Sequence, residues 1–356
     1  MKVCIVNNDY QYLMLEHWVD IGNEDIAYIF VPHRLNEKYF KYGKVFYSPI
    51  TGLKRYFYPA YILYLRFMFY TTSISRENVS DVIFFSEYDP FNAVLVNYFK
   101  ERGAKIHMLE DGGINTYVDL IDHPALESKK IKYKILNFIN NKILFISYFT
   151  FVDQGSRTFG RFADYLIDCV WCTRQVETCR DVKVCYQQLE ACAPESRNFS
   201  ITDYHRIIYL GQDLYPVYYS KQHFLAYLKK IMSLVNNLNV EFQYKPHPRE
   251  DICQVRSLLS ELGCNDVLIL TTSQPIEEYI LNVKETLFLS HSSSACFNLS
   301  SRGFNTALSF CLDDAFEKDT LFKLLKQQLR FTSKLDKDNI IYLANGRFRK
   351  LNFLGK

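Results

Sequence analysis

The chain has 356 residues, of which 48% are hydrophobic and 23% charged, and its formal net charge is +3. This charged fraction is normal for a folded protein and argues against disorder, while the near balance of charges argues against a protein built mainly to bind nucleic acid. The length exceeds what one compact core usually holds and suits two domains.

The first residues of the chain, Met1–Tyr10, lack the basic and apolar regions of a signal peptide. No stretch of about 18 uninterrupted apolar residues is present, so the sequence predicts no transmembrane helix. We therefore expect a cytoplasmic protein.

Short apolar runs alternate with segments of helical periodicity in the first half of the chain, a pattern typical of a parallel sheet covered by helices. A helix is expected over Pro90–Arg102, with Gly103 as its C-terminal cap. The expected strands are Val3–Val6, Ile26–Val31, Val82–Phe85 and Ile106–Leu109.

Two segments of the first half combine aromatic and basic residues, Leu53–Tyr70 and Lys129–Phe151. Such a segment is either an interfacial helix, with lysines or arginines on one face and aromatics on the other, or a core helix whose lysines snorkel to solvent. Peripheral attachment to the cytoplasmic face of the inner membrane is therefore a hypothesis that the sequence raises and does not decide.

Ten cysteines are present, and five of them fall between Cys169 and Cys192. A zinc site needs two closely spaced pairs, or one pair followed by histidines, and the pair Cys169 and Cys172 has neither complement. We therefore expect small buried core residues with reduced thiols, and no metal site.

The stretch 193–205 is polar and poor in periodicity, which makes it the candidate linker between two domains, residues 1–195 and 196–356. Helices are expected after it, over Lys221–Leu238 and Gln254–Leu262. The expected strands of this half are Arg206–Leu210, Val240–Tyr244, Val267–Leu270 and Glu285–Leu289. The sequence thus predicts two successive α/β domains.

Two adjacent carboxylates, Glu110 and Asp111, follow an expected strand and precede Gly112 and Gly113. Ligand sites of open α/β sheets gather after strand ends, and glycines let a ligand approach the backbone closely. Because neighbouring side chains on an extended segment point to opposite sides, one carboxylate can face a ligand as general base while the other braces the loop. An ordinary Asp-Gly turn is the simpler alternative.

A histidine lies between two prolines in the segment Lys245-Pro246-His247-Pro248-Arg249. The prolines restrict the backbone and hold His247 in an extended conformation. Together with Lys245 and Arg249 it offers three nitrogen donors that suit a phosphate, and a protonated histidine can donate to a leaving phosphate oxygen. The alternative is a histidine that merely caps a loop.

Three serines, Ser292, Ser293 and Ser294, follow the expected strand Glu285–Leu289. Hydroxyls and backbone N–H groups at a helix N-terminus form an anion site, whereas simple N-capping would use one serine and leave the others without a task. Shortly before that strand, Glu277 opens a helix, where its carboxylate either interacts with the helix dipole or accepts hydrogen bonds from ribose hydroxyls.

The order of these motifs resembles that of the bacterial sialyltransferases, most closely the lipooligosaccharide sialyltransferases of glycosyltransferase family 52. The stretches that carry the resemblance, within roughly residues 80–300, are EDGG, KPHPRE, Ile276-Glu277 and HSSSA. The resemblance implies an α/β enzyme of the GT-B class, with two Rossmann-like domains facing each other across a cleft. The first domain would bind the acceptor and the second CMP-sialic acid, with inversion of the anomeric carbon and without a metal or other cofactor.

By this resemblance His247 contacts the CMP phosphate and helps it to depart, and Glu277 binds the ribose. The other expected donor-binding residues are Lys245, Pro248, Ser292, Ser293 and Ser294.

The general base is expected to be a carboxylate of the acidic pair. We favour Asp111 over Glu110 and keep Asp213, near the start of the second domain, as the rival. The residues expected to face the acceptor, because they lie at strand ends of the first domain, are Asn7, Asn8, Asp9 and Gly112.

The expected function is transfer of sialic acid from CMP-sialic acid to a galactose-type acceptor on bacterial lipooligosaccharide or capsular polysaccharide. Other CMP-activated sugars, namely Kdo or another nonulosonate, would be read by the same nucleotide motifs. A polysialyltransferase is a further alternative, although the near-neutral charge counts against the long basic groove that its polyanionic acceptor would need. An inactive GT-B protein that binds nucleotide or glycan in an assembly is the non-enzymatic alternative.

Overall fold

The chain divides into two compact units, Met1–Leu189 and Glu190–Lys356. The expected boundary between residues 195 and 196, and most of the expected linker, lie outside the described residues. The computed structural model describes residues 1–18, 26–31, 43–47, 78–85, 90–110, 131–143, 145–148, 150, 162–172, 182–186, 204–216, 219–238, 240–272, 276, 285–302, 304–313, 341–344 and 347–350.

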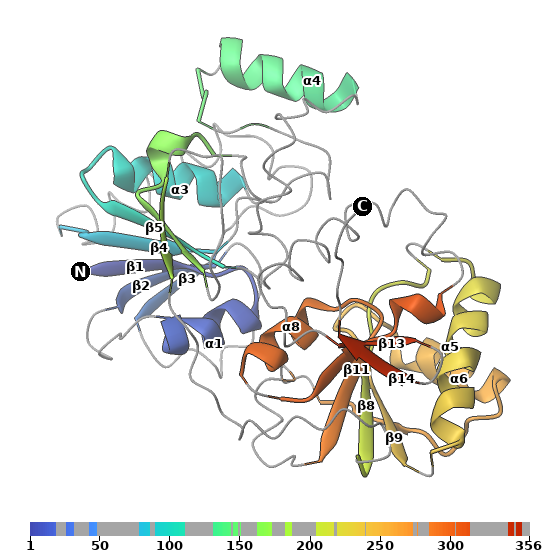
Figure 1. Ribbon diagram of the computed structural model, residues 1–356. Coiled ribbons are helices and arrows are strands. Elements are labelled where there is room, and N and C mark those ends of the chain that lie inside the picture. Colours follow the sequence, from blue (N-terminus) through green and yellow to red (C-terminus); the bar gives the residue numbers. More distant parts are fainter. Residues whose placement is uncertain are drawn as a thin grey trace. The chain divides into compact units, whose positions relative to one another are not determined.

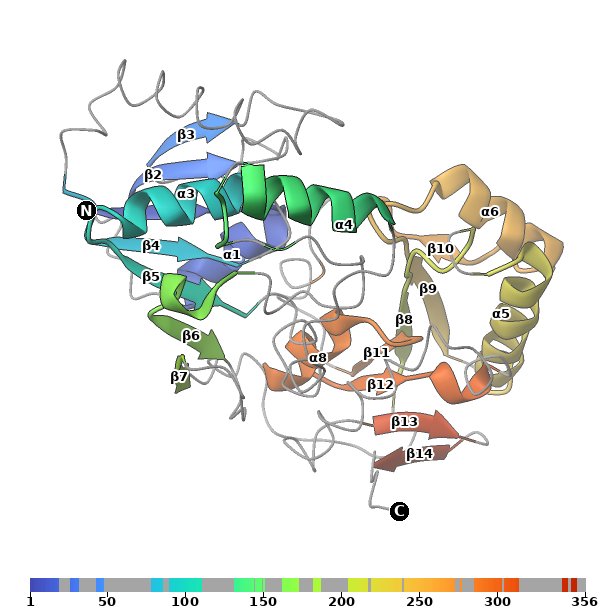
Figure 2. The ribbon, with the colours of Figure 1, turned by 90° about the horizontal axis from the view of Figure 1, so that it is seen from above.

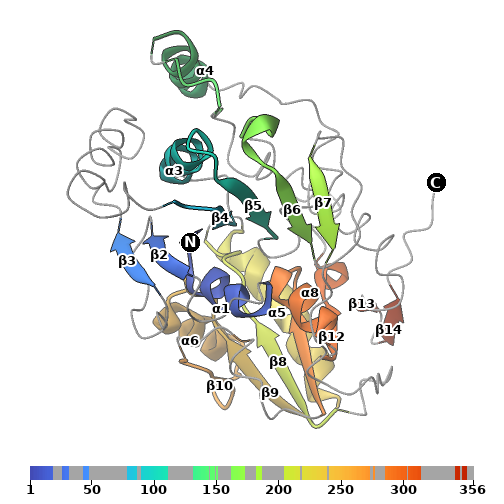
Figure 3. The same cartoon turned by 90° about the vertical axis from the view of Figure 1, so that its left-hand side faces the viewer.

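The first unit is built on a parallel sheet whose strand order is β3-β2-β1-β4-β5-β6-β7, which can be followed in Figure 3. The strands are β1 (Lys2–Ile5), β2 (Ile26–Val31), β3 (Lys44–Tyr47), β4 (Asp81–Phe84), β5 (Lys105–Leu109), β6 (Cys169–Cys172) and β7 (Lys183–Tyr186). Its described helices are α1 (Asp9–Trp18), α3 (Pro90–Lys100), α4 (Ile131–Phe138), the π-helix η5 (Ile139–Ile143) and the 3₁₀ turn η6 (Asp164–Leu166).

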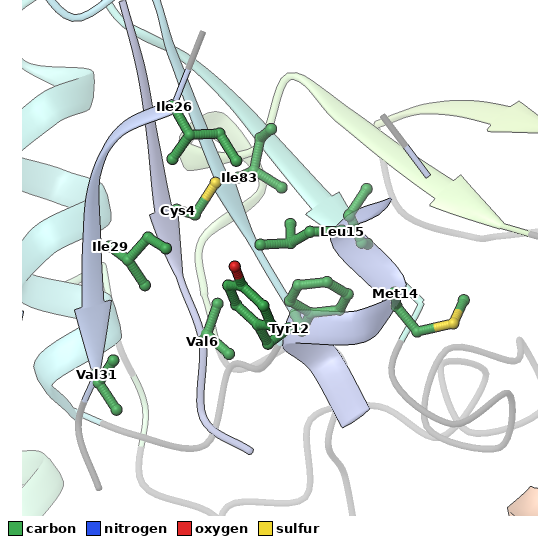
Figure 4. Packing of buried hydrophobic residues seen from close by; sticks show 11 residues of the cluster. Cys4, Val6, Tyr12, Met14, Leu15, Ile26, Ile29, Val31 and Ile83 are labelled. Atoms are coloured by element: carbon green, nitrogen blue, oxygen red, sulfur yellow. The ribbon is translucent and has the colours of Figure 1, made fainter. Parts of the chain in front are cut away.

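Helices α1 and α3 cover opposite faces of this sheet (Figures 1 and 3). Alternate residues of a strand point to opposite faces, so Cys4 and Val6 pack with Leu15 of α1 in one buried cluster (Figure 4). On the other face, the ring centroid of Phe30 lies 6.5 Å from that of Phe91 and 6.2 Å from that of Phe99, both on α3. Each such buried side chain contributes about 1.5–3 kcal/mol, so the helices are held by packing on both faces.

Helix α3 ends at a glycine cap, as the sequence predicts. Gly103 has a φ of +86°, a conformation that glycine adopts without strain. The N–H of Ala104 donates to the carbonyl of Phe99 over 3.1 Å, which satisfies a carbonyl of the last turn. The turn then delivers the chain into β5.

The second unit has a sheet of the order β10-β9-β8-β11-β12-β13-β14, parallel except for the last pair. The strands are β8 (Arg206–Leu210), β9 (Glu241–Lys245), β10 (Leu268–Ile269), β11 (Thr286–Ser290), β12 (Thr306–Leu308), β13 (Ile341–Ala344) and β14 (Arg347–Lys350). Its helices within the described ranges are α5 (Lys221–Asn236), α6 (Ile252–Glu261), α8 (Ser294–Ser301) and the 3₁₀ turn η8 (Phe310–Leu312). Helices α5 and α6 lie on one face of the sheet and α8 on the other (Figure 2).

The helices α5 and α6 begin at capping residues and bury one stripe each. The Oγ of Ser220 accepts the N–H of His223, and Oδ1 of Asp251 accepts the N–H of Cys253. The buried stripe of α5, spaced three and four residues apart, consists of Phe224, Tyr227, Leu228, Ile231, Met232 and Val235. These contacts fix the loops that precede both helices.

The expected strands are all present, with ends displaced by no more than one residue, and the three expected helices end within two residues of the predicted bounds. Cys169 and Cys172 are buried in β6, which confirms them as core residues. The segment Leu53–Tyr70 lies outside the described residues. No helix in the described part of the chain is long and apolar enough to cross a membrane.

Candidate functional site

Both sheets have the same strand order, in which the direction of strand addition reverses between the first and fourth strands of each unit. The reversal lies between β1 and β4 in the first unit and between β8 and β11 in the second. In open parallel sheets, ligands bind outside the carboxyl ends of the strands at such a switch point. The side chains that come directly after these strands are therefore the first candidates for a site.

At the switch point of the second sheet, the loop after β8 is joined to the loop after β11. Oε1 of Gln212 accepts the backbone N–H of Ser292 over 2.7 Å, and the amide lies 3.4 Å from the Ser292 hydroxyl. Ser292 is buried. The two loops thus form one connected edge.

The loop after β9 brings His247 to this edge in a defined orientation. Nδ1 of His247 accepts the N–H of Arg249 over 3.2 Å, so in the neutral ring the proton sits on Nε2, which is left as a donor. Burial lowers the pKa of His247 below its usual value, and the charges of Arg249 and Lys245 lower it further, while Asp213 opposes them. The result is a neutral imidazole whose hydrogen is on Nε2.

Glu250 holds the His247 loop in place. Its two carboxylate oxygens accept the N–H of His247 over 2.7 Å and the hydroxyl of Tyr244 over 2.9 Å. A Cβ on Gly211 would overlap the Glu250 carboxylate. A glycine is therefore required where the loop after β8 approaches the loop after β9. Burial raises the pKa of Glu250 to about 7.

Asp213 belongs to the same group of residues. Its Oδ2 lies 3.9 Å from Nη1 of Arg249, and its negative charge acts to raise the pKa of His247. The structure therefore brings together His247, Lys245, Arg249 and Asp213 after β8 and β9. It does not test the expected role of Asp213 as general base.

The serine motif after β11 contains a helix cap. Oγ of Ser293 accepts the N–H of Ala295 over 3.2 Å, and the N–H of Ser293 donates to Oγ of Ser290 over 3.0 Å. N-capping is thus one task of Ser293, and α8 begins at Ser294. The side chains of Ser294 and Glu277 lie outside the described residues, and no phosphate role of the serines is tested.

Behind the serines lies a buried polar cluster that the sequence did not predict. His291 is completely buried, with Nε2 at 3.0 Å from Oδ2 of Asp313 and Nδ1 at 2.9 Å from the Ser292 hydroxyl. His223 and Tyr219 also contact the Asp313 carboxylate. The motif HSSSA contains His291. Its hydrogen-bond partner Asp313, however, follows β12, a strand that the sequence pattern does not predict.

At the switch point of the first sheet, amide side chains tie β1 to helices of the same unit. Oδ1 of Asn7 accepts from Nδ2 of Asn92 on α3 over 2.9 Å, and the N–H of Asn7 donates to Oε1 of Gln11 over 2.7 Å. Oδ1 of Asn8 accepts the N–H of Gln11, which caps α1, and Asp9 is the first residue of that helix. These residues lie where the sequence placed them, and their contact with an acceptor stays a prediction.

The acidic pair is only partly described. Glu110 is buried directly after β5, and its N–H donates to the carbonyl of Trp171 over 3.0 Å. Asp111 and Gly112 lie outside the described residues. In the residues that the structure describes, no cluster of His, Cys, Asp or Glu could hold a metal ion.

Comparisons with known proteins add a family and a fold. The model of the alpha-2,8-polysialyltransferase (POLYST) family matches residues 69–301, well over half of the chain. No curated protein matches the chain.

The solved structures that are similar to this chain include two with TM-scores just above 0.5. The chain is similar to an alpha/beta-galactoside alpha-2,3-sialyltransferase from Photobacterium phosphoreum, with a TM-score of 0.51, 14% identity and coverage of 96% of this chain and 98% of that one. It is also similar to a protein assigned as a UDP-N-acetylglucosamine 2-epimerase from Listeria monocytogenes, with a TM-score of 0.52, 8% identity and coverage of 86% and 78%. At these identities the likeness concerns the fold, and the two Rossmann-like domains are confirmed as those of the GT-B class.

Proposed function

Because the chain belongs to the alpha-2,8-polysialyltransferase family, we propose that it transfers sialic acid from CMP-sialic acid to a galactose-type acceptor on lipooligosaccharide or capsular polysaccharide. Membership of that family makes the chain a glycosyltransferase of the sialyltransferase kind. The observation that supports the donor most directly is the orientation of His247, whose Nδ1 accepts a hydrogen bond within its own loop, so that the hydrogen of the neutral ring is on Nε2.

In the proposed reaction the donor phosphate lies at the edge formed after β8, β9 and β11. His247 donates through Nε2 to the phosphate oxygen that bonds the anomeric carbon, and Lys245 and Arg249 offset the charge that develops as this bond breaks. The electron pair of the broken bond stays on the phosphate oxygen of the departing CMP. Because desolvation lowers the pKa of His247 and Nδ1 accepts the N–H of Arg249, the neutral ring acts at the phosphate as a hydrogen-bond donor through Nε2.

On the acceptor side, the hydroxyl oxygen attacks the anomeric carbon from the face opposite the phosphate, which inverts the configuration. Its proton passes to a carboxylate, for which we propose Asp111. The contact between Asp213 and Arg249 supports a role for Asp213 in holding that cation, and Glu110, buried after β5, suits bracing of the loop. The residues proposed to face the acceptor are Asn7, Asn8, Asp9 and Gly112.

We propose that the reaction needs no metal ion, because the nitrogen donors around His247 can take the role of a cation at the phosphate. Transfer in the presence of excess chelator should equal transfer with added Mg²⁺. A requirement for Mg²⁺ would contradict this part of the proposal.

Elongation of α2,8-linked polysialic acid is the second candidate, and the family match favours it. The donor chemistry is the same, whereas the acceptor is itself a sialic acid. Purified protein should therefore be incubated with CMP-sialic acid and either a galactose-terminated or an α2,8-disialyl-terminated acceptor, and the products separated by mass.

Transfer to the first acceptor supports the proposal, and transfer only to the second supports the elongating enzyme. The variant His247→Ala should show neither product. Use of CMP-Kdo in place of CMP-sialic acid would overturn the donor sugar, and binding of CMP without any transfer would favour the non-enzymatic assembly protein.

We further propose that α4 attaches the protein to a membrane surface. The exposed fractions of Ile131, Ile135 and Phe138 are 75%, 53% and 61%, and their spacing of four and three residues places them in one stripe. Lys132 and Lys134 lie on either side of this stripe, where their ammonium groups can reach lipid headgroups while the apolar side chains insert. Of the two interpretations that the sequence leaves open for this segment, the exposure favours the interfacial helix.

Co-sedimentation with vesicles tests this attachment. The wild type should bind vesicles that contain phosphatidylglycerol, and the double variant Ile135→Ser, Phe138→Ser should lose most of that binding. Leu268→Ser is a matched control, because Leu268 is an exposed apolar residue of the other unit, with an exposed fraction of 52%. Equal binding by the double variant and the wild type would contradict the proposal.

A further inference from the structure

A buried acid, a buried imidazole and a serine hydroxyl form one hydrogen-bonded line behind the proposed phosphate site. The line runs from Asp313, through Nε2 and Nδ1 of His291, to Oγ of Ser292, with contacts of 3.0 and 2.9 Å. The side chains of Asp313 and His291 are both 0% exposed. Buried ionisable groups of this kind are costly, and no step of the proposed reaction uses His291 or Asp313.

The Asp313 contact determines which way the Ser292 hydroxyl points. A carboxylate only accepts, so Nε2 of His291 carries a hydrogen, and in the neutral ring Nδ1 is an acceptor. Ser292 must then donate its hydroxyl hydrogen to Nδ1. In this state Ser292 can offer a ligand an oxygen lone pair and no hydrogen, which does not suit an anion.

Protonation of His291 reverses that hydrogen bond. Nδ1–H then donates to Oγ of Ser292, and the hydroxyl hydrogen is released to donate to a ligand. Protonation also places a positive charge beside the Asp313 carboxylate, which already accepts a hydrogen bond from the Tyr219 hydroxyl and contacts Nε2 of His223. A buried carboxylate with a paired cation is less costly than one without.

The same residue types in series activate a nucleophilic serine in hydrolases, which also need backbone N–H groups free to hold an oxyanion. Here the N–H of Ser292 donates to Gln212 and the N–H of Ser293 donates to Ser290. Both backbone donors next to the hydroxyl are therefore occupied. The geometry suits binding by the hydroxyl and does not suit acyl transfer.

We propose that binding of the donor phosphate is coupled to uptake of one proton by His291, which turns the Ser292 hydroxyl from a donor to His291 into a donor to the phosphate. His291 and Asp313 are positioning residues that act through Ser292. The proton comes from solvent, and no bond of the nucleotide is made or broken in this step. The inference rests on the proposed CMP-linked donor.

Burial holds the pKa of His291 below its usual value, although the hydrogen bond and charge of Asp313 raise it. Without a ligand, the His291 ring is therefore neutral near pH 7. The negative charge of a bound phosphate favours protonation of this ring. CMP affinity should fall by up to about tenfold per pH unit above neutrality. Among the residues that the structure describes, the titratable groups around His291 and Asp313 include Tyr219 before α5, His223 and Tyr227 of α5, and Cys296 of α8.

Calorimetric titration with CMP at pH 7.5, in two buffers that differ in ionisation enthalpy, measures the protons taken up. His247→Gln removes any proton taken up by His247, and uptake should persist in that variant. His291→Gln and Ser292→Ala should each remove the His291 proton and weaken CMP binding by about tenfold, the effect of one hydrogen bond to a charged group. Ser292→Ala also serves as the small, conservative change should His291→Gln not fold.

Ser293→Ala is the matched control, because it removes the neighbouring hydroxyl and the cap of α8 but leaves the line to Asp313 intact. Its proton uptake should equal that of the wild type. Unchanged uptake in Ser292→Ala, with CMP still bound, would overturn this inference and leave the donor class standing. Absence of CMP binding by the wild type would overturn both.

Discussion

The two units share one strand order and differ in the side chains that their strands present at the carboxyl ends. After β1, the first sheet carries the amides Asn7 and Asn8, which tie the strand to α1 and α3. After β8, β9 and β11, the second sheet carries cations, imidazoles and hydroxyls around His247 and Ser292. The same switch point therefore carries structural amides in one unit and groups suited to an anion in the other.

Strand order thus fixes where a ligand can bind, and the loops decide which ligand it is. Among the described residues, the second unit also buries the ionisable side chains His291 and Asp313 in its interior. Variants that change one unit at a time should separate the two roles.

The largest effect is expected from His247→Ala. It removes the proposed hydrogen-bond donor at the phosphate, so transfer should fall by about 100-fold or more, while far-ultraviolet circular dichroism and the unfolding temperature stay near those of the wild type. His205→Ala is the matched control, because the imidazole of His205 is 85% exposed and its ion pair with Glu285 is on the surface. Activity near that of the wild type in His247→Ala would contradict the role of His247.

Gly211→Ala should give the next largest effect. The new Cβ would displace the Glu250 carboxylate that holds the His247 backbone, so CMP affinity should fall by about tenfold and stability by about 1–3 kcal/mol. Gly263→Ala provides the comparison. Its φ of +71° makes alanine unfavourable by about 1 kcal/mol, but nothing lies within 4 Å of the added Cβ, so CMP binding should not change.

Glu250→Gln should change the pH dependence of stability. Because burial raises the pKa of Glu250 from its usual value to about 7, the folded protein binds more protons than the unfolded chain below pH 7, and stability falls as the pH rises through this range. Glutamine keeps one acceptor oxygen for the N–H of His247, offers its NH2 to the Tyr244 hydroxyl, which can also accept, and removes the charge. The variant should be more stable than the wild type by about 1–3 kcal/mol at pH 8 and by much less at pH 5.

Urea unfolding of Glu250→Gln and the wild type at pH 5 and pH 8 gives the four free energies needed. A difference between the two proteins that is the same at both pH values would show that Glu250 does not titrate in this range.

The smallest effect is expected in the first unit, from Asn8→Ala. Loss of the α1 cap should lower stability by about 1 kcal/mol. If Asn8 only caps the helix, the KM for the acceptor stays unchanged, and if it also contacts the acceptor, the KM rises while the CMP affinity does not. Acceptor kinetics and CMP titration of the same preparation decide between the two.

The strands that position both edges could be predicted because their apolar runs are short and bounded by turn residues, as in Ile26–Val31 and Arg206–Leu210. The sequence pattern does not predict the strands β3, β7, β12, β13 and β14. The first two are only partly buried, so their patterns are weakly apolar, and β12 is just Thr306–Leu308. The segment Cys169–Cys172 is expected as a pair of buried cysteines and not as a strand, because two of its four residues are cysteines. In the structure it forms β6.

The sequence located His247 and the serines but not the residues that hold them. Glu250 is three residues beyond His247, and only the structure shows that its carboxylate accepts the His247 N–H. Asp313 is separated from His291 by a helix and a strand, and no local pattern links two residues that meet only through tertiary packing. Partners of this kind depend on which loops the sheet order brings together.

The CMP-sugar site proposed for the second unit is best tested by the unfolding temperature of the purified protein with CMP, compared with UDP, GDP and ADP. A nucleotide that binds only the folded state stabilises it by about 2.7 kcal/mol at a concentration one hundred times Kd. We expect a rise with CMP and none with the other three. A rise with UDP or GDP, and none with CMP, would contradict the assignment of the second unit as a CMP-sugar site.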